Sequence, residues 1–369
     1  MKEENRQGVS ARIKELEDQI KNTKYNKRTQ HAVGLYKAKL AQLKEKQETR
    51  RGIGKGDEGY SVRRTGDATV VLVGFPSVGK STLLNQLTNA KSKTAAYAFT
   101  TLTVVPGLME YKHAKIQILD VPGILKGAAD GTGRGREVLS VLTAADMALI
   151  LIDVFEPHQL DVLQKELYDA HLRLNREPPD IKIKKTGKGG ISVSTTVQLT
   201  KTTKETVAAI LRELRLMNAD VLIRDDVDAD QVIDAVEGNK RYLPAVIAIN
   251  KIDTATPEEF AAVAKAIPGS IPISAEQGVN IDLVKERIFQ GLGFLRIYMK
   301  EVGKKADMNE PLIIRGPATV EQVCRKLHQD FIKRFRFARV WGRSAKFPGQ
   351  KFKLNHTLAD EDVLQVVLR

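Results

Sequence analysis

Residues 74–82 read Gly74-Phe-Pro-Ser-Val-Gly-Lys-Ser-Thr82, and they follow the apolar run at residues 68–73. The run is typical of a buried parallel strand, and residues 81–87 are typical of the start of a helix. A Gly-x4-Gly-Lys-Ser sequence in this position predicts a loop whose backbone N–H groups surround nucleotide phosphates, whereas the alternative is a glycine-rich turn without a ligand. We expect Lys80 to neutralise the β- and γ-phosphate oxygens and the Ser81 hydroxyl to bind Mg²⁺. The predicted phosphate-contacting residues are Gly74, Phe75, Pro76, Ser77, Val78, Gly79, Lys80, Ser81 and Thr82.

A second motif, Asn250-Lys251-Ile252-Asp253, follows the apolar run at residues 245–249 and predicts which base is bound. The Asp253 carboxylate can accept hydrogen bonds from guanine N1–H and the guanine 2-amino group, while adenine offers no such pair of donors. A site built on this pairing rejects adenine, because the carboxylate would be left desolvated and unpaired. The motif therefore favours GTP and GDP and argues against an ATPase or kinase. The alternative interpretation is an exposed polar turn.

A third motif, Asp120-Val121-Pro122-Gly123, ends the predicted strand at residues 115–119. We expect Asp120 to hold Mg²⁺ indirectly, through another ligand of the ion, and the Gly123 N–H to sense the γ-phosphate. Upstream, Phe99-Thr100-Thr101-Leu102 lies where a switch threonine belongs, and one of its two hydroxyls is predicted to bind Mg²⁺ when the γ-phosphate is present.

The segment Ser274-Ala275-Glu276 follows a predicted strand at residues 270–273. Its position after the guanine motif predicts a loop whose backbone contacts the guanine O6 atom. The three residues complete the predicted set of nucleotide contacts.

These motifs resemble those of the Obg-type GTPases. The stretch Pro178-Pro-Asp-Ile-Lys-Ile-Lys-Lys185, together with Gly189-Gly-Ile-Ser192, is similar more narrowly to the developmentally regulated GTP-binding (DRG) proteins. The resemblance implies an α/β fold: a P-loop GTPase domain with a mostly parallel, doubly wound sheet. It also implies an inserted ribosomal-protein-S5-like α+β subdomain, a C-terminal β-grasp (TGS) domain and a role at the ribosome. It selects Thr101 over Thr100 as the Mg²⁺ ligand, and a DRG-family regulatory protein is one expected partner.

The sequence patterns and the resemblance together predict the domains. They are a basic N-terminal helical hairpin with a linker at 1–60, a GTPase domain at 61–174 and 242–297, an inserted subdomain at 175–241 and a TGS domain at 298–369. The predicted helices lie at 156–174, 203–217, 229–237 and 320–335. Further strands are predicted at 180–184, 191–197, 220–224, 311–314 and 363–368.

The N-terminal hairpin is predicted from apolar residues that recur every three or four positions. The pattern occurs at Ile13, Leu16 and Ile20, and then at Leu35, Leu40 and Leu43. Two such helices bury little surface alone, so we expect them to pack on the GTPase core or on a partner.

The net charge of +14 is concentrated at the two ends of the chain. Residues 1–64 carry +8, residues 298–369 carry +7, and the residues between them carry −1. A GTPase core needs no basic excess, so the ends are predicted to contact a polyanion, namely RNA. Since the resemblance implies a role at the ribosome, the expected partner is the ribosome and its RNA. The alternative is that these charged faces are merely solvated.

The C-terminal run Lys333-Arg-Phe-Arg-Phe-Ala-Arg-Val-Trp-Gly-Arg343 interleaves cations with aromatic rings. This composition is typical of surfaces that stack on bases and pair with phosphates. The alternative places Phe335, Phe337 and Trp341 in a core and only the cations outside. The basic turn at residues 182–188 is open to the same two interpretations, an RNA contact or a solvated hairpin tip.

Composition predicts a cytoplasmic protein that is not embedded in a membrane, and we expect it to be monomeric. The single cysteine, Cys324, excludes an intramolecular disulfide. Apolar runs such as residues 147–152 are far too short to span a bilayer, and no signal-peptide pattern opens the chain.

The catalytic residues are predicted to be Lys80, Thr101 and Gly123. Ile124 stands where many GTPases carry a glutamine that orients the attacking water, so intrinsic hydrolysis should be slow. Related GTPases that depend on K⁺ often carry asparagine at the position of Ser77. The serine therefore weakens the case for K⁺ as a cofactor but leaves it open.

The glycine-rich segment at residues 123–136 is expected either to supply Arg134 or Arg136 as an internal arginine finger or to dock on a partner as a switch loop. The sequence thus predicts a slow, GTP-hydrolysing molecular switch acting on ribosomes. The alternative from another class is an RNA-binding assembly protein that holds GTP as a structural ligand.

Overall fold

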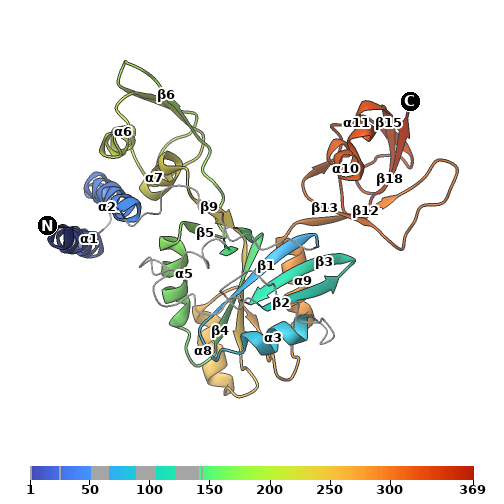
Figure 1. Cartoon of the computed structure of the whole chain (residues 1–369), viewed down its shortest axis with the longest axis horizontal. Coiled ribbons are helices and arrows are strands. Elements are labelled where there is room, and N and C mark those ends of the chain that lie inside the picture. The colour runs from blue at the N-terminus through green and yellow to red at the C-terminus, as the bar shows by residue number, and fades with distance from the viewer. Residues whose placement is uncertain (1, 25, 51–65, 89–104, 121–140, 143) are drawn as a thin grey trace. The chain divides into compact units, whose positions relative to one another are not determined.

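The computed structural model describes residues 2–24, 26–50, 66–88, 105–120, 141–142 and 144–369. The chain divides into two compact units, one from Met1–Gly59 and His171–Tyr242 and the other from Tyr60–Ala170 and Leu243–Arg369. Figure 1 labels the elements of both units. Since the chain leaves the second unit after Ala170 and returns at Leu243, the segment between them is an insertion.

The second unit contains a six-stranded sheet, several of whose strands are labelled in Figure 1. Neighbouring strands run parallel except β2, which is antiparallel to β3. This confirms the predicted α/β fold with a mostly parallel sheet. In spatial order the strands are β11 (Ile271–Pro272), β10 (Ala245–Asn250), β4 (Met147–Asp153), β1 (Ala68–Val73), β3 (Ala114–Asp120) and β2 (Val105–Tyr111).

Helices cover this sheet because its central strands are apolar on both faces. Every residue of β1 and β4 is buried. Leu83 of α3 (Lys80–Leu87) and Ile288 of α9 (Ile281–Gly291) are fully buried in one apolar cluster with residues of both strands. Further helices of this part include α5 (Gln159–Asp169) and α8 (Pro257–Ala266).

The single helix predicted at residues 156–174 is wrong after residue 169. Helix α5 ends at Asp169, and His171 takes a left-handed backbone with φ 63°, which a helix cannot continue through. Residues Leu172–Leu174 then form β5, which pairs with β9 (Arg241–Leu243). A partner strand about seventy residues away therefore overrides the local helical pattern, which the sequence of the segment could not reveal.

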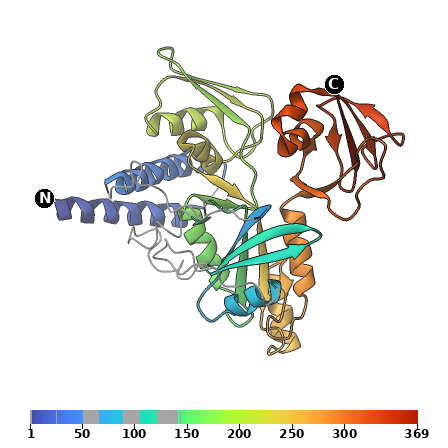
Figure 2. The same cartoon turned by 45° about the vertical axis from the view of Figure 1, so that its right-hand side comes forward.

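The C-terminal module of the second unit is a sheet packed against one helical layer (Figure 2). Val323 and Cys324 of α10 are buried against Ala338 and Val340 of β15. In spatial order the main sheet contains β13 (Leu312–Arg315), β12 (Phe294–Met299), β18 (Val363–Leu368), β15 (Phe335–Trp341) and β16 (Gln350–Phe352). The remaining elements are β14 (Ala318–Thr319), β17 (Thr357–Leu358), α10 (Val320–Leu327) and α11 (Gln329–Lys333).

The predicted helix at residues 320–335 is in fact two helices and the start of a strand. His328 is extended, with φ −172° and ψ 148°, and separates α10 from α11. Phe335 then begins β15 and packs against the apolar cluster of the module. The expected domain boundary between residues 297 and 298 falls within β12.

In the first unit, the inserted segment is a small α+β structure. Its three-stranded sheet has the order β6 (Ile181–Lys185), β8 (Ala219–Ile223), β7 (Ile191–Thr195). Helices α6 (Lys204–Glu213) and α7 (Ala229–Glu237) pack on it through apolar residues such as Ile210 and Val232. The predicted helix at 229–237 is confirmed, while α6 ends four residues before its predicted end at 217.

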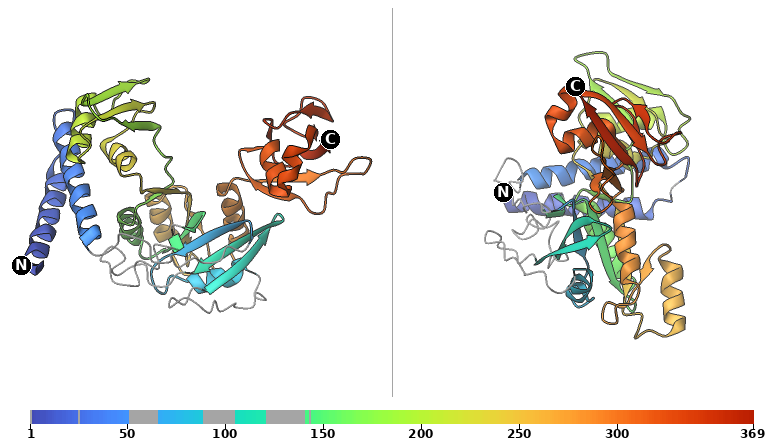
Figure 3. Two further views of the ribbon diagram at one scale, coloured as in Figure 1. Left: turned by 45° about the horizontal axis from the view of Figure 1, so that its top comes forward. Right: turned by 90° about the vertical axis from the view of Figure 1, so that its right-hand side faces the viewer.

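The N-terminal hairpin consists of α1 (Lys2–Asn22) and α2 (Gln30–Arg50), which lie side by side in the left panel of Figure 3. It was expected to pack on the GTPase core or a partner, but α2 packs on α6 and α7 of the inserted segment. The contact uses small residues one turn apart. A Cβ atom at Gly34 would lie 3.0 Å from the Thr206 side chain, and Ala38 is fully buried.

This contact is also polar, because Lys37 pairs with Asp230 at 2.6 Å. The predicted residues Leu35, Leu40 and Leu43 are only partly buried. Among the residues that the structure describes, no helix is long and apolar enough to cross a membrane.

Candidate functional site

The predicted nucleotide motifs meet at one edge of the six-stranded sheet. The loop at residues 74–79 follows β1, Asp120 ends β3, Asn250 ends β10, and Ser274 lies two residues after β11. All four strands run in the same direction, so the motifs lie at their carboxyl ends. This edge is where open α/β sheets bind ligands.

The loop between β1 and α3 is shaped by two close approaches of its backbone. A Cβ atom at Gly79, where φ is +95°, would lie 2.4 Å from Asn250 Nδ2, and one at Gly74 would lie 2.6 Å from Leu151 O. Gly79 is also the N-cap of α3 and provides no side-chain acceptor to the first turn. The free N–H groups of that turn favour an anion at this end of the helix.

Lys80 points back along the loop that precedes it. Its Nζ donates hydrogen bonds to Gly74 O at 3.0 Å and to Phe75 O at 2.9 Å. Burial lowers the pKa of Lys80, and the negative charge of Asp120 opposes that shift. The ammonium group is thus held in the loop by carbonyl oxygens, which an anionic ligand can replace.

Ser81 and Asp120 form the pair predicted to hold a metal ion. Ser81 Oγ donates to Asp120 Oδ2 at 3.2 Å, while Asp120 Oδ1 is buried and has no hydrogen-bond partner in the described part of the chain. Burial raises the pKa of Asp120, and Lys80 and the Ser81 hydrogen bond oppose this shift. A hydroxyl beside an unsatisfied carboxylate oxygen suits a hard cation such as Mg²⁺.

Asn250 ties the first loop to the last one. Its Nδ2 donates to Val78 O at 2.8 Å, and its Oδ1 accepts a hydrogen bond from Ala275 N at 2.9 Å. The residue is only 4% exposed, so both bonds are formed away from water. Sequence reasoning placed Asn250 at the nucleotide, but the structure shows that its amide also joins the two loops that flank the site.

Asp153 is a site residue that sequence reasoning missed. It ends β4 and lies directly opposite Asn250 of β10. Its Oδ2 accepts from Lys251 Nζ at 2.6 Å, which holds the lysine stem beside the strand ends. The signal was present in the sequence, since Asp153 ends a buried apolar run as Asp120 does.

Asp253 and the segment at residues 274–276 differ in exposure. Asp253 is exposed and makes no hydrogen bond or ion pair among the described residues. Ser274 is fully buried, and its Oγ accepts a hydrogen bond from Gln277 N at 3.1 Å, which shapes the turn. The Asp253 carboxylate is therefore available to a ligand, while the Ser274 hydroxyl stabilises the conformation of its own loop.

Several predicted residues lie outside the described part of the chain. They are Phe99, Thr100, Thr101, Val121, Pro122, Gly123, Ile124, Arg134 and Arg136. Their roles stay predictions.

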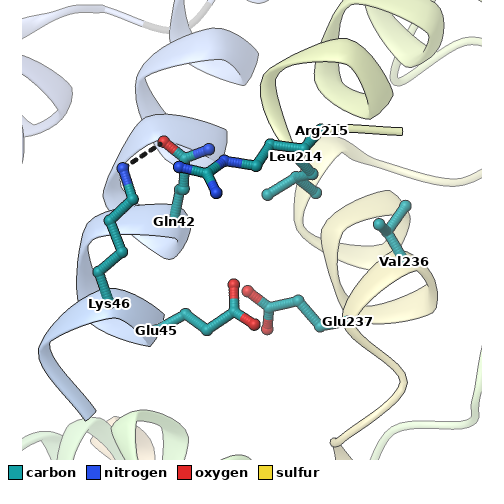
Figure 4. Close-up of a pocket in the computed structure, with 7 residues that line it drawn as sticks. All are labelled: Gln42, Glu45, Lys46, Leu214, Arg215, Val236 and Glu237. Carbon is teal, nitrogen blue, oxygen red and sulfur yellow. Dashed lines mark hydrogen bonds between the residues drawn. The ribbon is translucent and has the colours of Figure 1, made fainter. Parts of the chain in front are cut away.

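A separate cavity of about 520 Å³ lies in the first unit, between α2 and the ends of α6 and α7 (Figure 4). Figure 4 shows the carboxylates of Glu45 and Glu237 pointing toward one another, and Glu237 pairs with Lys240 at 2.5 Å. The lining residues are Gln42, Glu45, Lys46, Leu214, Arg215, Val236 and Glu237. Since none belongs to a nucleotide motif, this cavity is not the nucleotide site.

Comparison with protein families agrees with the geometry of the sheet edge. Residues 69–185 match the family described as 50S ribosome-binding GTPase, and residues 188–294 match the C-terminal region of that domain. Residues 295–368 match the TGS domain.

Individual relatives match nearly the whole chain. An uncharacterized GTP-binding protein of Methanocaldococcus jannaschii is 52% identical over 98% of this chain and 93% of its own length. Developmentally-regulated GTP-binding protein 1 of Xenopus laevis is 45% identical, and developmentally-regulated GTP-binding protein 2 of Homo sapiens is 42% identical. Each of these two alignments covers 98% of this chain and 99% of the relative. The chain therefore belongs to the family of developmentally regulated GTP-binding proteins, and it is a GTP hydrolase with a C-terminal TGS domain.

Proposed function

We propose that the protein is a slow GTP-dependent switch that acts on ribosomes in the cytoplasm. The observation that carries the nucleotide part is the pair at the sheet edge, where the Ser81 hydroxyl lies beside a buried Asp120 oxygen that has no hydrogen-bond partner among the described residues. The ribosome part rests on the basic excess at the two ends of the chain and on the family description of residues 69–185 as a ribosome-binding GTPase.

The motif residues at the edge of the six-stranded sheet are assigned separate roles in nucleotide binding. The loop at residues 74–82 surrounds the phosphates, and Lys80 leaves its carbonyl partners to neutralise them. Ser81 and Thr101 bind Mg²⁺ directly and Asp120 binds it indirectly. The ion supplies positive charge against the phosphate oxygens. The Gly123 N–H senses the γ-phosphate.

Base recognition is assigned to the exposed carboxylate of Asp253. Asn250 places the guanine-reading loop at residues 274–276 against the phosphate loop, because it is bonded to both. A base that fits Asp253 is thereby aligned with phosphates that fit Lys80. This coupling supports a nucleotide sensor.

The absence of a glutamine at Ile124 supports slow intrinsic turnover, since isoleucine cannot orient water. The ribosome, or a regulatory protein of the DRG family, is then the expected source of acceleration. K⁺ is a further candidate cofactor that potassium titration of the turnover rate would test. We expect the protein to work as a monomer.

The base assignment is tested by Asp253→Asn. We expect this variant to bind GTP at least about 100-fold more weakly and to gain affinity for xanthosine triphosphate, whose 2-oxo group accepts from the asparagine amide. Fluorescent-nucleotide titration measures both affinities. Asp282→Asn is the matched control, because the Asp282 side chain is 90% exposed at the start of α9. An unchanged preference for guanine would remove the assignment.

The switch is tested by single-turnover GTP hydrolysis with and without purified ribosomes, together with co-sedimentation in each nucleotide state. We expect ribosomes to accelerate hydrolysis at least tenfold, which is about 1.4 kcal/mol of the barrier. GTP should favour co-sedimentation over GDP. Equal association in all nucleotide states without acceleration would instead support an assembly protein that holds GTP as a structural ligand.

A further inference from the structure

The outer face of the five-stranded sheet in the C-terminal module combines aromatic rings with cations. Side chains alternate between the two faces of a strand. Ala338 and Val340 of β15 are buried in the apolar cluster beneath α10. Phe337, Arg339 and Trp341 therefore lie on the opposite face, where each is only partly buried.

Neighbouring strands bring further cations to this face. Lys351 of β16 pairs in register with Arg339 and shares its side of the sheet. Lys351 Nζ lies 4.9 Å and the Arg339 guanidinium 5.7 Å from the centre of the Phe337 ring. Lys300 Nζ lies 5.7 Å from the Trp341 ring. We call these five residues, Lys300, Phe337, Arg339, Trp341 and Lys351, the aromatic-basic face.

This arrangement decides between the two interpretations of the basic and aromatic run. Phe335 packs against the apolar cluster of the module, as the core interpretation requires. Phe337 and Trp341 do not belong to that cluster, and cations lie over both rings. Two of the three aromatic residues therefore lie outside that core.

The cations of the module differ in whether a carboxylate neutralises them. On the helical side, Arg325 pairs with Glu321 at 2.6 Å and Lys333 with Asp330 at 3.7 Å. Lys300, Arg339 and Lys351 have no carboxylate partner among the described residues. The uncompensated positive charge of the module therefore includes these three cations on its sheet side.

We propose that the aromatic-basic face binds single-stranded RNA. Its cations can pair with phosphates spaced along a strand, while the rings of Phe337 and Trp341 and the guanidinium plane of Arg339 can stack with unpaired bases. In duplex RNA the bases are paired and stacked inside the helix, so they cannot stack on the aromatic rings of this face. An acidic peptide would satisfy the cations and leave the rings without a partner. This inference rests on the RNA partner in the proposed function and assigns its contact surface.

Trp341 is the only tryptophan of the chain and reports directly on stacking. Titrating the full-length protein with a twelve-nucleotide uridine RNA should quench its intrinsic fluorescence, and anisotropy of a labelled copy gives the affinity. The double variant Arg339→Ala with Lys351→Ala should bind at least tenfold more weakly. Its slope of log affinity against log salt should be smaller by about 1.4, because two phosphate contacts are lost.

The matched control removes two cations from the other side of the same module. Arg325→Ala with Lys333→Ala should change the RNA affinity less than twofold, since both cations already have carboxylate partners. A milder pair, Lys300→Gln with Lys351→Gln, keeps the side-chain length if the alanine pair lowers the melting temperature. GTP turnover without ribosomes should be unchanged in every variant.

Each outcome has a distinct meaning. RNA binding without quenching, or with equal loss in both pairs, would overturn the assignment of this face and leave the GTP switch intact. Equal affinity for polyglutamate or for duplex RNA of the same length would overturn the stacking role. If ribosomes did not stimulate GTP hydrolysis by the wild-type protein, the proposed function would be contradicted, but the assignment of the RNA-binding face would not.

Discussion

The six-stranded and the five-stranded sheets of the second unit present polar groups in opposite ways. At the edge of the six-stranded sheet, several polar side chains are bonded within the protein: Asn250 to Val78 and Ala275, and Lys251 to Asp153. On the outer face of the five-stranded sheet, Arg339 and Lys351 lie over Phe337 without a carboxylate partner among the described residues.

This difference separates two kinds of recognition. A buried, internally bonded network holds its donors and acceptors in fixed positions, so it is selective and weakly screened by salt. Exposed cations over aromatic rings tolerate many sequences, and their attraction to phosphates falls steeply with salt. Removing one hydrogen bond at the nucleotide edge should therefore cause a large loss of GTP affinity. Removing one cation from the aromatic-basic face should lower RNA affinity only modestly.

The largest effect is expected from Asn250→Ala. The variant removes both hydrogen bonds of the Asn250 side chain, to Val78 O and from Ala275 N. Each backbone group that loses its partner costs about 1–3 kcal/mol of stability. We expect GTP affinity to fall at least about 100-fold and the melting temperature to drop. Fluorescent-nucleotide titration and thermal unfolding measure the two effects.

Asn85→Ala is the control for this variant, because Asn85 is exposed on α3. It should bind GTP within twofold of the wild type. If Asn250→Ala kept its affinity, the edge would not depend on its internal bonds, and the contrast between the two sheets would fail.

A second prediction concerns Asp120→Asn. Burial raises the pKa of Asp120, so the charged carboxylate costs stability in the ligand-free protein at neutral pH. The neutral amide should therefore raise the melting temperature without nucleotide and magnesium. The same change should weaken Mg²⁺-dependent GTP binding about 30-fold, because the negative charge that attracts the ion is lost.

Magnesium titrations of GTP binding and differential scanning fluorimetry check these opposite signs. Asp282→Asn again serves as an exposed control, which should change neither quantity. A lower melting temperature for Asp120→Asn would mean that the carboxylate stabilises the edge.

A third prediction compares the salt dependence of the two sheets. If Lys300, Arg339 and Lys351 each contact one phosphate, affinity for single-stranded RNA should fall about 20-fold between about 50 and about 200 mM salt. GTP affinity at saturating Mg²⁺ should fall less than threefold, because Asp120 and Asn250 at the nucleotide edge are buried and therefore weakly screened. Parallel titrations of RNA and nucleotide test this. Equal slopes of log affinity against log salt for RNA and GTP would show that the two sites depend equally on exposed charge.

The smallest effect is expected at the N-terminal end, where Lys37 already pairs with Asp230 at 2.6 Å. Lys37→Ala should lower stability by no more than about 1 kcal/mol. RNA affinity should stay within twofold, in contrast to the Arg339 and Lys351 pair. A larger loss of RNA affinity would show that a cation with a carboxylate partner still contributes to the polyanion surface.

Residues with a short-range signature were predictable. The strand at 68–73, the loop with its two glycines, and the placement of Asn250 at a strand end all follow from patterns within about ten residues. The contact of α2 with the inserted segment was not predictable. It depends on Gly34 and Ala38, whose small size makes them a weak sign of a buried helix face but allows close packing.

The sequence by itself determined the chemistry of the nucleotide edge, because motif spacing and strand ends decide which groups can face a phosphate or a guanine. Only the tertiary structure decided which polar atoms are already used and which are available. Asn250 joins two loops that are far apart in sequence, and its role there depends on the packing of β10 between its neighbours. Likewise, the sides of β15 on which Phe335 and Phe337 lie depend on a register shift between them, which local alternation does not reveal.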